Sequence, residues 1–282
     1  MNGTVSNFHY GAVTPITAYL MACLGSALGL RCTTRSLRRA RPGHRAGWLL
    51  LGAVSLGCGI WTMHFIAMIG FGVAETPVDY DPKRTMLSLA IAIVVVALGV
   101  FLVGYRGAAP ANLAAAGVFT GLGVAAMHYV GMAALEMHGT VRYRTAEVVL
   151  SVVISVVAAT AALWAAVSVR GAWPAFGASL VMAMAVTGMH YTGMAAVTVR
   201  LHEVSPGAPS SVGLLSFLLV MLAGPLVALL VAGVIVMFDP DVVLGDGPWN
   251  TPGTGPGPIP GARSGGLLAP RPPDGIAPRA LR

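Results

Sequence analysis

Seven long apolar runs follow one another along the chain, and short polar segments separate them. The runs cover about residues 11–30, 46–71, 86–104, 111–136, 147–169, 174–199 and 213–237. A stretch of about 20 apolar residues can cross a bilayer as a helix, because a helix satisfies every backbone polar group internally. The pattern therefore predicts an all-α membrane protein with seven transmembrane helices.

The composition supports a protein whose main surroundings are the lipid bilayer. Hydrophobic residues make up 56% of the 282 residues, charged residues only 10%, and the mean hydropathy is +0.78. Soluble domains carry roughly 25% charged residues. The net charge of +7 does not indicate nucleic-acid binding, because the arginines lie in the predicted loops and tail.

Three regions follow from the same pattern. Residues 1–10 are polar and contain no Lys or Arg, so we expect an extracytoplasmic N-terminus that is not a signal peptide. Residues 11–237 form the seven-helix membrane domain. Residues 238–282 are rich in Pro and Gly, a composition typical of a disordered tail.

The distribution of Lys and Arg predicts the orientation of the helices. Of the 17 basic residues, twelve fall on one side of the predicted membrane, in the loop 31–45, at Arg106 and Arg170, and in the tail. The other five lie on the opposite side, at Lys83, Arg84, Arg142, Arg144 and Arg200. We therefore expect the N-terminus outside and the C-terminus in the cytoplasm of a multi-pass protein of the inner (plasma) membrane.

A short motif recurs near the ends of the second, fourth and sixth runs. It reads Met127-His128-Tyr129-Val130-Gly131-Met132 and Met189-His190-Tyr191-Thr192-Gly193-Met194, with Met63-His64-Phe65-Ile66-Ala67-Met68 as a less regular first copy. The histidines are 64 and 62 residues apart, which is the length of two helices and their loops. The chain is thus predicted to hold three parallel two-helix repeats around a pseudo-threefold axis along the membrane normal, plus one extra helix.

Each motif offers ligands for a metal ion on one face of its helix. The pairs His64 and Met68, His128 and Met132, and His190 and Met194 are four residues apart, a spacing that puts both side chains on one face. Each His is expected 7–9 residues before the outer end of its run, about 10–14 Å below the outer surface. Neutral imidazole and thioether ligands without a nearby carboxylate favour copper.

Other residues of the motifs are weaker candidates. Met63, Met127 and Met189 precede the histidines and are additional candidate ligands. Tyr129 and Tyr191 could hydrogen-bond a histidine and orient its ring. One such histidine would be interpreted as a packing residue of a membrane helix, but three at one depth favour a shared ligand site.

These motifs resemble the MHYT domain, a bacterial integral-membrane sensory module named for the run found here at Met189-His190-Tyr191-Thr192. The resemblance covers about residues 11–237, although the first copy departs from it at Phe65, Ile66 and Ala67. It implies copper binding by the Met and His residues of the motifs and sensing of a diatomic gas such as oxygen, carbon monoxide or nitric oxide. Many relatives join this module to a cyclic-di-GMP enzyme or a kinase. Because a Pro/Gly-rich tail follows here, we expect the signal to pass to a separate protein partner.

Alternative functions remain open at this point. A copper permease or copper-handling protein would need ligands along a path, and Met182 and Met184 are the hint of one. Haem held by two of the histidines is a third hypothesis. An enzyme is not expected, because the sequence contains no nucleophile–base set, phosphate loop or paired carboxylates.

Overall fold

The computed structural model describes residues 3–38, 42–169, 171–201 and 211–238. Within these residues, seven helices are long and apolar enough to cross a membrane, as the sequence predicts. They are α1 (Val13–Arg38), α2 (Pro42–Ile69), α3 (Pro82–Arg106), α4 (Pro110–Met132), α5 (Thr145–Ser168), α6 (Ala172–Ala195) and α7 (Ser211–Met237). The predicted tail lies outside the described residues, apart from Phe238.

The helix boundaries differ from the predicted runs in two ways. Helix α1 continues to Arg38 rather than residue 30, because Arg and Leu are good helix formers and no Gly or Pro interrupts residues 31–38. The helices α4 and α6 end at Met132 and Ala195, about one turn before the predicted ends at 136 and 199. In both cases the chain leaves the helix to enter a β-strand.

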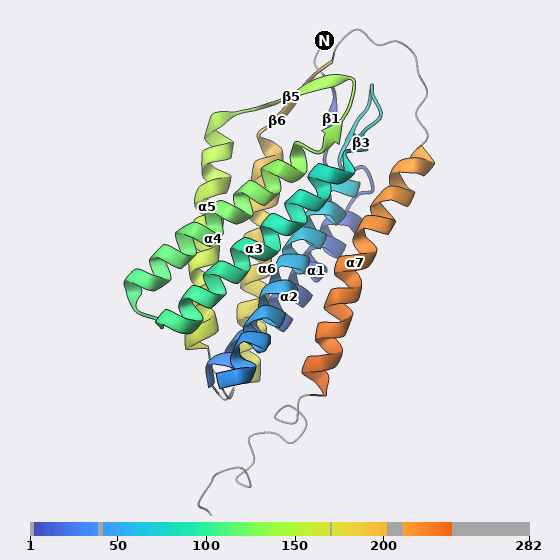
Figure 1. The fold of residues 1–282 in the computed structure, drawn as a ribbon. Coiled ribbons are helices and arrows are strands. Elements are labelled where there is room, and N and C mark those ends of the chain that lie inside the picture. The colour runs from blue at the N-terminus through green and yellow to red at the C-terminus, as the bar shows by residue number, and fades with distance from the viewer. Residues whose placement is uncertain (1–2, 39–41, 170, 202–210, 239–282) are drawn as a thin grey trace, which may run out of the picture. The chain divides into compact units, whose positions relative to one another are not determined.

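Six helices form a closed ring in sequence order. Each packs against the next, and α6 packs against α1 to close the ring (Figure 1). The motif-bearing helices α2, α4 and α6 alternate with α1, α3 and α5. Helix α7 stands outside the ring against α2 and α1, where Leu229 and Ala232 join a cluster with Leu28 and Cys58. The predicted arrangement of three helix pairs plus one helix is therefore present.

Three short strand pairs lie at one end of the ring, which we call the strand-bearing end (Figure 1). The strands are β1 (Val5–Ser6), β2 (Gly72–Val73), β3 (Asp79–Tyr80), β4 (Leu135–Glu136), β5 (Gly139–Tyr143) and β6 (Val197–Leu201). The antiparallel pairs are β1 with β2, β3 with β4, and β5 with β6. Each repeat is thus a strand, two helices and a second strand that pairs with the first.

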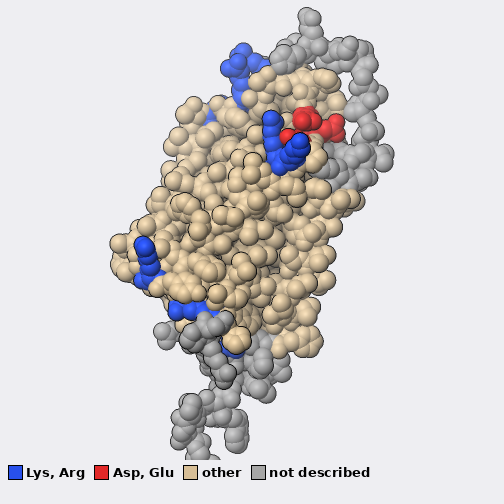
Figure 2. Space-filling model, in the orientation of Figure 1, with Lys and Arg blue, Asp and Glu red and all other residues tan. Residues whose placement is uncertain are grey.

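The surface between the two ends is apolar. Lys and Arg gather toward the ends of the molecule, and the face in Figure 2 shows uncharged residues between them. Large apolar side chains are exposed on this part of the surface, among them Leu98, Phe119, Val157 and Val181. A soluble protein rarely exposes so much contiguous apolar area. The chain is a multi-pass membrane protein.

Candidate metal centre

The three motif histidines meet at a single point inside the ring. The distance between the Nδ1 atoms is 3.0 Å from His64 to His190, 3.2 Å from His64 to His128 and 3.3 Å from His128 to His190. Each side chain is only 1% exposed. One histidine comes from each of α2, α4 and α6, so the convergence that the repeat predicted is present. We call these three residues the histidine triad.

The triad lies closer to the helix ends than the sequence suggested. His64 is followed by five residues of α2, His128 by four of α4 and His190 by five of α6. At a rise of 1.5 Å per residue, the triad is about 6–8 Å from the helix ends, and its depth below the membrane surface stays a prediction. For α4 and α6 the difference arises because β4 and β6 begin where the apolar runs continue.

Hydrogen bonds alone cannot satisfy three nitrogens in this arrangement. Each Nδ1 either carries a proton or offers a lone pair. Three atoms in mutual contact cannot alternate between the two states, so at least one contact joins two donors or two acceptors. A cation at the centre removes this conflict, because all three lone pairs can point at it while each ring keeps its proton on Nε2.

The dimensions of the triad suit one metal ion. The centre of a triangle with sides of 3.0, 3.2 and 3.3 Å is about 1.8 Å from each corner. A metal–imidazole bond is roughly 2.0–2.1 Å long, at least for zinc. A small outward shift of the three rings would therefore bring the nitrogens to bonding distance.

Two glycines make room for the triad. A Cβ atom on Gly131 would lie 2.5 Å from Nε2 of His64, and a Cβ atom on Gly193 would lie 2.5 Å from Nε2 of His128. Each glycine is three residues after the histidine of its own motif, so each motif provides space for the histidine of the preceding repeat. The third place in this cycle holds Ala67, which is 2% exposed.

The six motif methionines are buried in the same core. Met63, Met68, Met127, Met132, Met189 and Met194 are each 1–2% exposed and belong to one core cluster. Ligation by their sulfur atoms stays a prediction. The two methionines that suggested a copper path lie in different places. Met182 lines a cavity, whereas Met184 is 61% exposed on the surface of the ring.

The motif tyrosines lie beside the triad, but their hydroxyl groups have other surroundings than expected. Each ring packs edge-on against the preceding histidine, with ring centres 4.9 Å apart for Tyr129 and 5.0 Å apart for Tyr191. The hydroxyl of Tyr129 pairs with Ser151 Oγ at 2.7 Å instead of a histidine. The hydroxyl of Tyr191 is buried without a hydrogen-bond partner among the described residues. Both tyrosines therefore support the rings by packing.

The N-terminal segment covers part of the strand-bearing end. Phe8 stacks on Tyr191 with ring centres 5.5 Å apart, the His9 amide donates to the Gly70 carbonyl, and the Gly3 amide donates to the Val199 carbonyl. The Thr4 amide also donates to Glu75 Oε2 at 2.9 Å. Hydrogen bonds from the Thr4 side chain and backbone hold the pKa of Glu75 below its ordinary value. Residues 3–10, the described part of the polar N-terminus that the sequence predicts, are thus part of the structure around the site.

Two arginines contact the ends of motif-bearing helices, and the sequence did not predict this structural role. Arg84 donates to the Ala133 carbonyl at 2.8 Å, and Arg144 donates to the Ala195 carbonyl at 2.6 Å. A positive charge at a helix C-terminus satisfies free carbonyl groups and interacts favourably with the helix dipole. Each arginine lies five residues after the first residue of a strand, β3 and β5, a repeat that the sequence could have revealed.

The chain is similar to known signalling proteins. The MHYT model, described as an N-terminal repeat of bacterial signalling proteins, matches residues 57–116 and 121–179. This chain belongs to the MHYT family. The two matches cover the first two histidines of the triad, and the third copy of the motif follows the second match. No solved structure matches the chain.

Several longer proteins are similar to a large part of this chain. A bifunctional diguanylate cyclase/cyclic di-GMP phosphodiesterase, MucR of Pseudomonas aeruginosa, is 38% identical over 192 residues, which are 66% of this chain and 28% of that protein. The cyclic di-GMP phosphodiesterase NbdA of the same organism is 37% identical over 213 residues, 72% of this chain and 26% of that protein. The signaling protein YkoW of Bacillus subtilis is 26% identical over 206 residues, 71% of this chain and 25% of that protein. The chain spans about a quarter of the length of these curated relatives.

Proposed function

We propose that the chain is a sensory module of the inner membrane in which His64, His128 and His190 hold one copper ion. The observation that carries the proposal is the contact of three buried Nδ1 atoms, which lie 3.0–3.3 Å apart. Three separate helices bring these atoms together. Helix packing alone does not require three imidazole rings to point the same nitrogen atom, Nδ1, at one another.

The donor set supports copper among the metals that bind imidazole. The triad offers neutral ligands, and the buried core around it provides thioether sulfur, which favours Cu(I). The group of potential ligands found among the described residues consists of the three histidines, without a carboxylate. Bound copper would supply an open coordination position for a neutral diatomic molecule such as oxygen, carbon monoxide or nitric oxide.

The protein's part in sensing is to couple the triad to the helices. Because α2, α4 and α6 each contribute one ring, a change in the separation of the rings changes the packing of all three repeats. These helices run from the triad to the opposite end of the ring, which the arginine distribution predicts to be cytoplasmic. We propose that the signal controls an effector of cyclic di-GMP turnover there, as the names of the relatives suggest. The membrane module itself is not catalytic in this proposal.

The other hypotheses fit the geometry less well. Haem with two axial histidines places their nitrogens roughly 4 Å apart on opposite faces of a flat ring, whereas the triad nitrogens contact one another. Copper transport needs further ligands along a path. The cavity on the far side of the triad from the strands offers Met182 and Met189 among mainly aliphatic residues.

Metal analysis of the purified protein tests the proposal. We expect close to one copper ion per chain, and loss of copper when His64, His128 and His190 are all changed to Ala. The matched control is His138→Ala, which changes an exposed histidine between β4 and β5 at the strand-bearing end. Full copper retention in the triple variant would exclude the triad as the site. Visible spectra with and without carbon monoxide or nitric oxide would then test ligand binding.

A further inference from the structure

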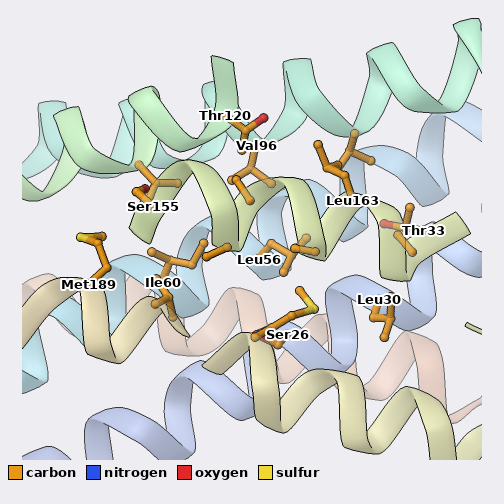
Figure 3. Close-up of a pocket in the computed structure, with 18 residues that line it drawn as sticks. Ser26, Leu30, Thr33, Leu56, Ile60, Val96, Thr120, Ser155, Leu163 and Met189 are labelled. Atoms are coloured by element: carbon orange, nitrogen blue, oxygen red, sulfur yellow. The ribbon is translucent and has the colours of Figure 1, made fainter. Parts of the chain in front are cut away.

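A cavity of about 70 Å³ lies between the helices of the six-helix ring (Figure 3). All six helices line it, for example with Leu30 of α1, Leu56 of α2, Val96 of α3, Leu163 of α5 and Met189 of α6. Figure 3 shows these side chains around a common space. Most of the lining consists of aliphatic carbon, so the cavity offers little to water.

The few hydroxyl groups in the lining do not change this character. Ser155 donates to the Gly121 carbonyl at 2.7 Å, Thr33 to the Gly29 carbonyl at 2.8 Å and Thr120 to the Val95 carbonyl at 3.5 Å. These three protons are therefore already used, within α1 for Thr33 and between neighbouring helices for Ser155 and Thr120. The lining also contains the hydroxyl of Ser26. Scattered hydroxyl groups in a mainly apolar lining give a water molecule few partners, so the cavity can bind an apolar guest.

The cavity begins one helical turn from the triad. Ile60, Val124 and Val186 each lie four residues before a triad histidine, and all three line the cavity. Residues four apart share a helix face, so these three side chains form a layer between the triad and the cavity. Met189, the residue before His190, also lines it. The other side of the triad is the strand-bearing end, where Phe8 packs on Tyr191.

We propose that this cavity is a binding site for a small neutral apolar molecule, of the size of a dissolved diatomic gas, that reaches the triad through the layer of Ile60, Val124 and Val186. The size of the cavity sets the class of ligand. An apolar cavity of about 150 Å³ in another protein accepts benzene or xenon, so about 70 Å³ suits a guest smaller than benzene. Such molecules also dissolve in the bilayer that surrounds the ring.

The binding site itself follows from the cavity, whereas its role as an approach to the triad rests on the proposed function. Xenon is a suitable probe, because it binds apolar cavities without needing copper. The full chain in lipid nanodiscs, labelled at isoleucine methyl groups, is placed under increasing xenon pressure. We expect a saturable shift of the Ile60 methyl signal. Ile16, which is 57% exposed on the surface, should show only the linear response to xenon dissolved in lipid.

Two leucine substitutions on α5 distinguish the effect of filling the cavity from the effect of changing the surface. Ala162 lines the cavity and its neighbour Ala161 is exposed, so Ala162→Leu should remove the saturable response and Ala161→Leu should keep it. Ala158→Leu, at another lining position, serves as a second filling variant if Ala162→Leu does not fold. A linear response of Ile60 in the unaltered protein, or a saturable one in the filled variants, would refute the cavity site.

Copper content measured on the same samples distinguishes the two proposals. Saturable xenon binding without copper would leave the cavity in place and overturn the metal centre. Copper without saturable xenon binding would leave the metal centre in place and overturn the cavity site. With copper present, Ala162→Leu should slow the binding of carbon monoxide to the metal, whereas Ala161→Leu should not. Equal rates would show that ligands reach the triad by another path.

Discussion

The first repeat differs from the other two at the positions around its histidine. Gly131 and Gly193 stand where the first repeat has Ala67, and Tyr129 and Tyr191 stand where it has Phe65. The first difference bears on space, since Nε2 of His64 faces Gly131 and Nε2 of His128 faces Gly193. The ring of histidines is therefore built from two similar corners and one that departs from them.

The comparison shows that a motif contributes to the surroundings of a histidine in another repeat as well as supplying its own. The glycine of one repeat makes room for the histidine of the preceding repeat, so a motif seen alone does not reveal its main contact. A histidine next to Ala67 has less room than one next to Gly131. Substitutions at equivalent positions should therefore have unequal effects in the three repeats.

The largest effect is expected from adding a methyl group at the two glycines. Gly131→Ala or Gly193→Ala would place Cβ 2.5 Å from a histidine Nε2, so the ring must shift from its place in the triad. Overpacking of this kind costs about 1–3 kcal/mol, or a roughly ten- to hundredfold loss of copper affinity in a chelator competition. Ala67→Gly removes a contact instead of adding one and should change the affinity much less.

Gly188→Ala is the control for this experiment. Gly188 lies on α6 two residues before His190, and a Cβ atom there would contact nothing within 4 Å. Its copper affinity should match that of the unaltered protein. Equal losses in Gly188→Ala and Gly193→Ala would mean that helix propensity, not the contact with His128, determines the result.

A smaller effect, of different sign in two repeats, is expected at the tyrosines. Tyr129→Phe breaks the hydrogen bond to Ser151 and should lower the free energy of unfolding by about 1 kcal/mol. Tyr191→Phe removes a buried hydroxyl that has no partner among the described residues, so it should leave that free energy unchanged or raise it. Denaturant unfolding in detergent measures both. A loss in Tyr191→Phe as large as that in Tyr129→Phe would contradict the assignment.

The smallest effect concerns the contact between Thr4 and Glu75, beside the strand pair of the first repeat. Because the pKa of Glu75 is lowered by hydrogen bonds from Thr4, the contact stabilises the folded segment above the ordinary pKa of a glutamate. That contribution is lost as the pH falls through the lowered pKa. Amide exchange at Thr4 should therefore rise relative to Val199 in acid, and Glu75→Gln should remove the pH dependence. The same dependence in Glu75→Gln would exclude this carboxylate as its source.

The sequence predicts most of the fold because the bilayer imposes a simple requirement on composition. Seven apolar runs, a repeat of 62–64 residues and three motifs led to seven helices, three repeats and three histidines at one place. The strand pairs were missed because apolar residues such as Val197 and Val199 continue the preceding apolar run. The alternation of Val197, Thr198, Val199 and Arg200 was the available signal for a strand.

The sequence predicts which residues form the site but not how they contact one another. The spacing of His and Met within a motif says which side chains share a face of one helix. It does not say that Gly131 faces His64 of another repeat, because that contact depends on how the three repeats pack. The cavity could not be predicted for the same reason, since it belongs to all six helices at once.

The pairing of the first and last strand within each repeat has a consequence for symmetry. A unit closed in this way supplies one third of the ring and could be repeated either by association of identical subunits or by joining copies in one polypeptide. Identical subunits would make every corner the same, and each substitution would occur three times. In a single polypeptide one corner can diverge alone, as Phe65 and Ala67 have, so the ring has a distinguishable side and a direction.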